Sequence, residues 1–204
     1  MKKFFALAAA TFALAALPPV LTAQEDGVAR FRGLAVEAHF ANLYAASGLS
    51  DHLLCVAGAG LGVEWTLPLN FDRFDLGASL RLDWSQYVPK SGGKLDSGFD
   101  IFALPGIFVR VPFKLGNLDF AFQPELSYGL AFKCPKGRSG LKGLYVDQVL
   151  CIAAGLRFVL PKLPVELELA PLFTAQFENS DVLFEAGFRL GAAWHFGKKN
   201  GGKK

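Results

Sequence analysis

The amino-acid sequence predicts an all-β fold: a single eight-stranded antiparallel transmembrane β-barrel with both the N and C termini periplasmic. Two features of the composition lead to this fold class. Apolar residues make up 52% of the 204 residues and the mean hydropathy is +0.32, which is high for a soluble protein. Yet no run of about eighteen apolar residues, as in a membrane helix, follows the first residues of the chain. Strands that turn one apolar face to lipid explain both features.

The stretch 182–196 is the clearest predicted strand. It reads VLFEAGFRLGAAWHF, in which every second residue is apolar, and Glu185 and Arg189 lie between the apolar positions. A period of two gives a strand one apolar face and one polar face. The stretch is much longer than the usual strand of about five or six residues. It suffices for the roughly nine to eleven residues with which a tilted strand crosses a bilayer.

Seven further alternating stretches precede this one. The connections after the second, fourth and sixth stretches are short or rich in proline, whereas those after the third and fifth are longer and basic. Membrane barrels have tight turns on the periplasmic side and longer loops outside. Because proline lacks an N–H, we expect bulges or ladder gaps at Pro105, Pro124 and Pro171. The eight predicted strands are 31–44, 53–66, 74–88, 99–113, 118–132, 144–160, 165–177 and 182–196.

The placement of charge also indicates a membrane barrel. All lysines between the leader and the tail fall in connections or at strand ends, and the charges in the middle of strands lie on the face opposite the apolar one. A charge on the lipid face near the midplane would cost about 2–4 kcal/mol. Aromatic residues near strand ends are typical of membrane girdles. We assign Trp65, Phe113, Phe158, Trp194 and Phe196 to the periplasmic girdle and Tyr44, Trp84, Phe132 and Phe177 to the outer one.

The interior of an eight-stranded barrel is just wide enough for side chains to fill it. Arg157 is expected opposite Glu166 or Glu168, across the turn between the sixth and seventh strands. At mid-depth, Arg81 and Arg189 are expected to meet Glu37 and Glu125, because a buried arginine favours forked carboxylate partners. The predicted interior ion-pair network consists of Glu37, Arg81, Arg110, Glu125, Arg157, Glu166, Glu168, Glu185 and Arg189.

Two interpretations of this interior remain open, a plug of salt bridges and a narrow polar path or small-molecule pocket. In the second strand the alternation places Leu53 toward lipid and three glycines toward the interior. Gly58, Gly60 and Gly62 leave room either for a pocket or for the long side chain of Arg81.

No catalytic residues are predicted. His39 and Glu185 face inward on strands that meet when the barrel closes, so we expect them near each other. However, no serine stands two residues after a histidine and no Gly-x-Ser-x-Gly motif is present. The three cysteines show no metal-ligand spacing, so we expect no metal and no cofactor.

Three segments are predicted along the chain: a signal peptide at 1–23, the barrel at 24–196 and a basic C-terminal tail at 197–204. Lys2 and Lys3 precede an apolar core that ends at two prolines, and Ala23 suits a cleavage position. An uncleaved membrane anchor is the alternative for this leader. Without the two lysines of the leader and the four of the tail, 21 basic residues fall to 15 against 18 acidic ones. This balance excludes a nucleic-acid surface.

The end of the last strand resembles a known signal. Arg189, Gly191, Trp194 and Phe196 resemble the carboxy-terminal assembly signal of bacterial outer-membrane barrels, except that this chain continues with GKKNGGKK. The whole body, 30–196, resembles the small eight-stranded outer-membrane proteins of the A, X and W types. This resemblance implies the outer membrane of a diderm bacterium. The partners that it implies are outer-membrane lipid and lipopolysaccharide, the barrel-assembly machinery and periplasmic chaperones.

The sequence predicts the function less specifically than the fold, because one barrel architecture serves pores, adhesins, anchors and enzymes. The sequence favours a barrel with a salt-bridged, largely plugged interior and a structural or surface role. The first alternative is a narrow porin or transporter for small or hydrophobic solutes. A lipid-modifying enzyme is the less favoured alternative.

Overall fold

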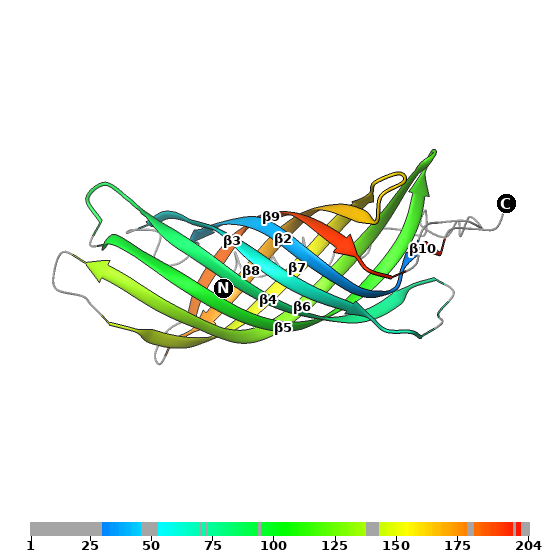
Figure 1. Cartoon of the computed structure of the whole chain (residues 1–204). Coiled ribbons are helices and arrows are strands. Elements are labelled where there is room, and N and C mark those ends of the chain that lie inside the picture. Colours follow the sequence, from blue (N-terminus) through cyan, green and yellow to red (C-terminus); the bar gives the residue numbers. More distant parts are fainter. Residues whose placement is uncertain are drawn as a thin grey trace, which may run out of the picture.

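Eight long strands form one closed antiparallel barrel in the computed structural model (Figure 1), in the order β2 to β9, with β9 pairing back onto β2. The prediction of an all-β, eight-stranded antiparallel barrel is confirmed. The structure describes residues 30–45, 53–69, 71, 73–93, 95–137, 143–178, 182–197 and 199–200; the predicted signal peptide lies outside them. The barrel strands are β2 Gly33–Ala45, β3 Leu53–Thr66, β4 Asp75–Pro89, β5 Leu95–Leu115, β6 Leu118–Gly137, β7 Tyr145–Val159, β8 Val165–Phe177 and β9 Val182–His195.

The two ends of the barrel differ. One end, the terminal end, carries the start of β2, the end of β9 and the turns after β3, β5 and β7 (right in Figure 1); the other is the loop end. At the terminal end, β1 Arg30–Phe31 pairs with β10 Lys199–Asn200 in a separate two-stranded sheet. The predicted first strand is therefore divided, because Gly33 adopts a positive φ of 93° that turns the chain between β1 and β2. Part of the predicted tail belongs to this small sheet.

Three corrections concern the loop end. β5 and β6 run several residues beyond their predicted limits, because the hydrogen-bond ladder between them continues past the apolar alternation. Lys133 therefore lies within a strand rather than in a connection or at a strand end, and its side chain faces the interior. Leu53 was expected to face lipid, but a β-bulge between Leu53 and Cys55 turns it inward, where it is 3% exposed.

The sequence predicted bulges or ladder gaps at the three prolines inside strands. The structure shows ladder gaps, without any shift in register. The β5–β6 pairing skips Leu104 and Pro105, and it skips again at Pro124. The β7–β8 pairing skips Pro171. Each proline stays in register with the strand on its other side. Each proline lacks an N–H donor, and the ladder gap is confined to one of its two neighbouring strands.

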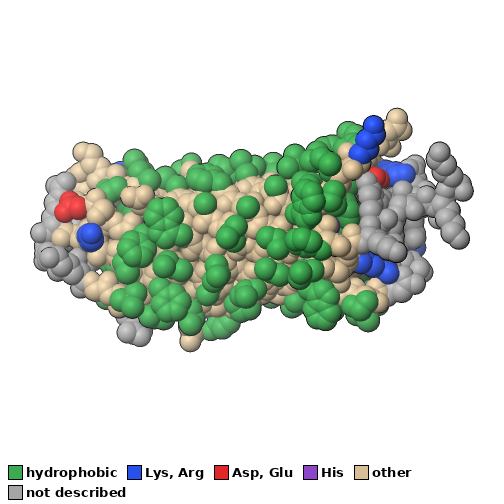
Figure 2. Space-filling view, viewed as in Figure 1, with side chains coloured by type: hydrophobic (Ala, Val, Ile, Leu, Met, Phe, Trp, Pro, Cys, Tyr) green, Lys and Arg blue, Asp and Glu red, His purple; other side chains and the backbone are tan. Residues whose placement is uncertain are grey.

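The outer wall of the barrel is apolar. Figure 2 shows hydrophobic side chains along the wall and charged ones only near the two ends. Soluble monomers rarely expose contiguous apolar patches beyond a few hundred Å², so this wall requires lipid around it. Every barrel strand contributes at least one large exposed apolar residue, for example Leu34, Leu61, Leu82, Ile107, Leu126, Leu156, Leu169 and Leu190.

The described residues contain no helix that is long and apolar enough to span a membrane.

Candidate functional site

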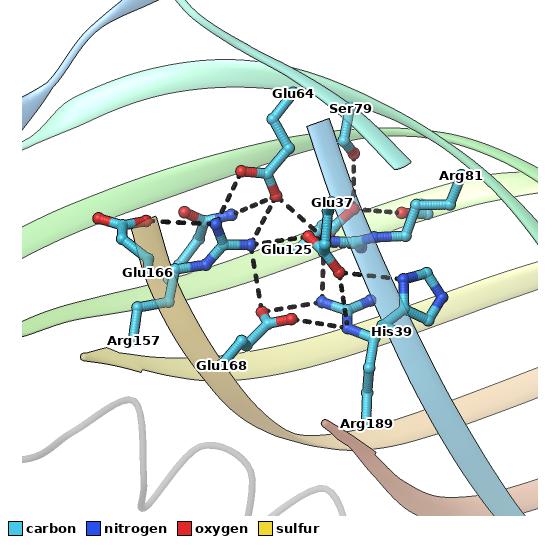
Figure 3. Close-up of polar contacts among 12 residues, drawn as sticks. Glu37, His39, Glu64, Ser79, Arg81, Glu125, Arg157, Glu166, Glu168 and Arg189 are labelled. Carbon is cyan, nitrogen blue, oxygen red and sulfur yellow. Dashed lines mark hydrogen bonds and ion pairs between the residues drawn. The ribbon is translucent and has the colours of Figure 1, made fainter. Parts of the chain in front are cut away.

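A group of buried charged side chains crosses the lumen in its terminal half, and all eight barrel strands contribute to it (Figure 3). Alternation along each strand turns these side chains inward, and closure of the barrel brings them together. The salt bridges fill the interior at this level. We call this group the ion-pair cluster; it consists of Glu37, Glu64, Arg81, Arg110, Glu125, Arg157, Glu166, Glu168 and Arg189.

Arg157 on β7 lies at the centre of the ion-pair cluster and is 0% exposed. Its two terminal nitrogens donate to the two carboxylate oxygens of Glu64 at 2.8 and 2.6 Å, in a forked geometry. Nη2 also lies 3.1 Å from Glu37 and 3.3 Å from Glu168, and Nη1 lies 3.4 Å from Glu166. One guanidinium therefore joins carboxylates from β2, β3 and β8, and such forked pairs are among the strongest in proteins.

The other three arginines extend the ion-pair cluster. Arg189 on β9 makes a second forked pair, donating from Nε and Nη2 to Glu168 at 2.9 and 3.0 Å. Arg81 on β4 donates to Glu125 on β6 and lies 3.4 Å from Glu37. Arg110 on β5 lies 3.0 Å from Glu166.

The sequence-derived network and the ion-pair cluster overlap in eight of their members, and they differ at one residue in each direction. Arg157 was expected to meet Glu166 or Glu168, and it lies within 3.4 Å of both. Glu185 is the correction. It lies toward the loop end, and its carboxylate accepts hydrogen bonds from Thr174 and Gln176 rather than from an arginine.

Sequence reasoning missed several polar members of this interior. Glu64 was not in the predicted network, although it contacts three arginines. Gln123 donates to Glu64 at 3.0 Å and accepts from Arg110 Nε at 2.8 Å. Ser79 donates to Glu125 at 2.6 Å. The available signal was the alternation that turns every second residue inward, and it does not specify which side chains meet across the lumen.

His39 does not approach Glu185, contrary to the expectation. It is opposite Gly191 on β9, whereas Glu185 is opposite Ala45, six residues farther along β2. At about 3.3 Å per residue this separation is roughly 20 Å. His39 instead lies between two carboxylates, with Nδ1 3.1 Å from Glu37 and Nε2 2.7 Å from Asp83.

Two of the three glycines on β3 make room for these polar side chains. A Cβ on Gly62 would approach Arg81 Cγ to 3.3 Å, so Gly62 gives Arg81 its space. A Cβ on Gly60 would lie 2.5 Å from His39 Nε2 and 2.1 Å from Asp83 Oδ1, which is closer than real Cβ atoms come to other atoms. The glycines therefore accommodate buried polar contacts rather than a pocket at this level.

The terminal end of the lumen is covered by aromatic and charged side chains. The buried ring of Phe31 on β1 stacks on His195, with ring centroids 4.2 Å apart. His195 Nε2 lies 3.0 Å from Glu166, which links this cover to the ion-pair cluster. Asp75 is fully buried and lies 3.5 Å from Arg32. The predicted network did not include Phe31, Arg32 or Asp75. Phe31 is positioned by the β1–β10 pairing, whereas Asp75 is the first residue of β4.

The loop-end half of the lumen has a different lining. Its buried side chains form a mostly apolar layer that includes Phe102, Leu104 and Leu172. Beyond this layer lies a cavity of about 360 Å³ that is lined by residues of β3 to β9 and by Glu178. We call it the loop-end cavity. Among the described residues, no three histidine, cysteine or acidic side chains are grouped so as to hold a metal ion.

Of the four residues of the predicted assembly signal, two lie on the inner face of the barrel and two on the outer face. Arg189 belongs to the ion-pair cluster, and Gly191 lies opposite His39. Trp194 and Phe196 face outward, and they are 50% and 64% exposed. The same strand end therefore completes the interior and supplies aromatic side chains to the outer wall.

The fold and this interior together define a class of protein, the eight-stranded membrane barrel with an ion-paired lumen. Among solved structures, the chain is similar to Neisserial surface protein A, with 15% identity, 82% of this chain and 99% of that chain covered, and a TM-score of 0.50. The attachment invasion locus protein of Yersinia pestis, crystallised with a heparin analogue, has 12% identity, coverage of 84% and 100%, and a TM-score of 0.49. The likeness to Neisserial surface protein A shows the fold, that of the small outer-membrane barrels.

No protein-family model matches the chain. A comparison with curated proteins also finds no match.

Proposed function

We propose that this chain is an outer-membrane barrel protein of a diderm bacterium with a structural or surface role and a lumen that does not conduct. The observation that supports this proposal is the ion-pair cluster, in which buried charges from all eight strands meet across the lumen. Removing one partner of a buried ion pair costs about 3–5 kcal/mol, so the side chains of the cluster resist separation. A conducting path would require several such pairs to open together.

The outer wall and the chain termini support the location and the partners. The apolar wall suits outer-membrane lipid, and lipopolysaccharide is the lipid partner that we propose at the loop end. Residues 1–23 would direct export as a signal peptide, with periplasmic chaperones as partners before insertion. Trp194 and Phe196 would be read by the barrel-assembly machinery, because they face outward at the end of the last strand. In this orientation both termini lie in the periplasm.

The surroundings of His39 favour a non-enzymatic role. A hydrolase of the serine type needs a nucleophile within hydrogen-bond reach of a base. The side-chain partners of His39 in the described structure are the carboxylates of Glu37 and Asp83. His39 thus lies beside the ion-pair cluster, in contact with two carboxylates, which is the position of a structural hydrogen-bonding residue.

Single-channel recording in planar bilayers tests the closed lumen. The refolded wild-type chain should insert without resolved conductance steps. The double variant Arg81→Ala/Arg189→Ala should give brief steps, because it removes two guanidinium groups from the cross-section and leaves Glu125 and Glu168 with fewer partners. The exposed Arg73 of the turn after β3 supplies the matched control, and Arg73→Ala should stay silent.

Insertion must be shown for each protein, for example by protection of the barrel from added protease. Regular conductance steps from the inserted wild type would overturn the closed lumen and favour the narrow pore.

A further inference from the structure

The loop-end cavity contains more negative than positive side chains. Four acidic residues, one lysine and a glutamine line it together with apolar side chains. Its volume of about 360 Å³ lies within the range of roughly 300–1,000 Å³ that is usual for small-molecule sites. The polar residues come from β5 to β9 and from the residue after β8: Asp100, Lys133, Asp147, Gln176, Glu178 and Glu185.

Lys133 balances only two of the four carboxylates. Its Nζ lies 2.8 Å from Asp147 and 3.0 Å from Glu178. Asp100 and Glu185 are almost fully buried, at 2% and 3% exposure, and neither has an ion-pair partner in the described part of the chain. A buried carboxylate without a cation is energetically costly.

Among the described residues, these two carboxylates accept hydrogen bonds from neutral donors alone. Asp100 accepts from the hydroxyl of Tyr87. Glu185 accepts from Thr174 Oγ1 at 2.9 Å and from Gln176 Nε2 at 2.7 Å. The two carboxyl groups are thus oriented by their neighbours and have no positively charged partner among the described residues.

Gln176 adds a second, independent indication of a ligand. Its side chain lines the loop-end cavity and is 0% exposed. Its amide nitrogen donates to Glu185, but its Oε1 has no hydrogen-bond partner among the described residues. A buried oxygen acceptor without a donor is rare in native structures. Next to Glu185, it favours a ligand group that both carries positive charge and donates hydrogen bonds.

The remaining wall of the cavity is apolar. Leu53, Val56 and Leu183 line it, and Tyr87 and Tyr145 add aromatic rings. A hydrated metal ion would gain nothing from these side chains, whereas an organic cation with an apolar body would bury that body against them. The inward turn of Leu53 at its β-bulge contributes directly to this wall.

We propose that the loop-end cavity binds a small organic ammonium ion with an apolar body, which donates hydrogen bonds to Glu185 and to Gln176 Oε1. Asp100 adds negative charge to the same site, and the apolar wall holds the body of the ligand. The inference rests on the proposed closed lumen in one respect, because the ion-pair cluster makes the cavity a dead end.

Isothermal titration of the full chain, folded in a non-ionic detergent, tests this site with three probes of one shape. The 2-phenylethylammonium ion should bind at least tenfold more tightly than neutral 2-phenylethanol, and phenylacetate should not bind. Equal binding of the ammonium ion and the alcohol would overturn the proposal. Titrations into protein-free micelles correct for partitioning of the probes.

Three variants sharpen the result. Glu185→Gln should weaken ammonium binding at least fivefold, whereas Lys133→Gln should tighten it, because it frees Asp147 and Glu178. Asp119→Asn makes the same charge change as a control at the terminal end and should leave binding unchanged. Unchanged affinity in a folded Glu185→Gln protein would also overturn the site.

The closed lumen and the ammonium site can be disproved separately. Channel activity with retained ammonium binding would remove only the closed lumen, and a silent barrel without binding would remove only the site.

Discussion

The terminal half of the lumen holds five buried glutamates and four arginines in direct contact, whereas the loop-end half holds an apolar layer and an acidic cavity with one lysine. In the terminal half, every glutamate of the ion-pair cluster lies within 4.0 Å of an arginine. In the loop-end half, the hydrogen-bond partners of Asp100 and Glu185 within the described residues are neutral donors. The first arrangement suits a seal that is complete within the chain, and the second suits a site that an external cation completes.

The largest expected effect follows from replacing Arg157, which lies at the centre of the ion-pair cluster. Arg157→Met should lower the free energy of unfolding by about 3–5 kcal/mol, because it leaves Glu64 and its neighbours buried without their main cation. Urea unfolding in lipid vesicles, followed by tryptophan fluorescence, measures this change. The matched control is Arg73→Met, which removes an exposed arginine from a turn. Similar losses for the two variants would show that the ion-pair cluster contributes little to stability.

A second prediction compares one chemical change in the two halves. Glu64→Gln should cost about 2–3 kcal/mol because it uncouples three arginines, whereas Glu185→Gln should change stability by less than about 1 kcal/mol. In the loop-end half, the amide oxygen still accepts a hydrogen bond, and the carboxyl group that it replaces has no arginine partner. The same unfolding assay compares the two proteins. A larger loss for Glu185→Gln would contradict the difference between the halves.

A third and smaller effect concerns salt. Lys133 lies at the cavity between Asp147 and a partly exposed Glu178, so Lys133→Met should cost only about 1 kcal/mol at low salt. At 1 M salt the Debye length falls to about 3 Å, and the loss should become smaller. The loss caused by Arg157→Met should persist, because that side chain is fully buried. Parallel unfolding curves at the two salt concentrations decide between these outcomes.

Much of the fold was predictable because lipid acts on every strand in the same way. Strand β3 has the predicted limits, 53–66, and β8 has the predicted limits, 165–177. The predictions failed where the lipid constraint ends: β5 and β6 continue beyond the apolar alternation, and the bulge after Leu53 reverses its side. Backbone hydrogen bonding determines the strand ends and the bulge at these places, and the side-chain pattern does not predict it.

The candidate site was predictable in composition but not in all its contacts. Arg157 meets Glu168 across a short turn, a local pairing that spacing alone suggests. Its forked partner, Glu64, lies 93 residues away on a strand that is not its neighbour. Glu185 shows the opposite case, since it faces inward but lies too near the loop end to reach an arginine.

By itself, the sequence determined that this chain is a membrane barrel with charges inside, because its long strands alternate an apolar face with a face that holds the mid-strand charges, as lipid outside and a polar interior require. The tertiary structure alone decided which charged side chains pair across the lumen and which acidic ones have neutral partners among the described residues. The reason is physical: the register and tilt of eight closed strands set the depth of each inward side chain, and depth determines which residues meet across the lumen.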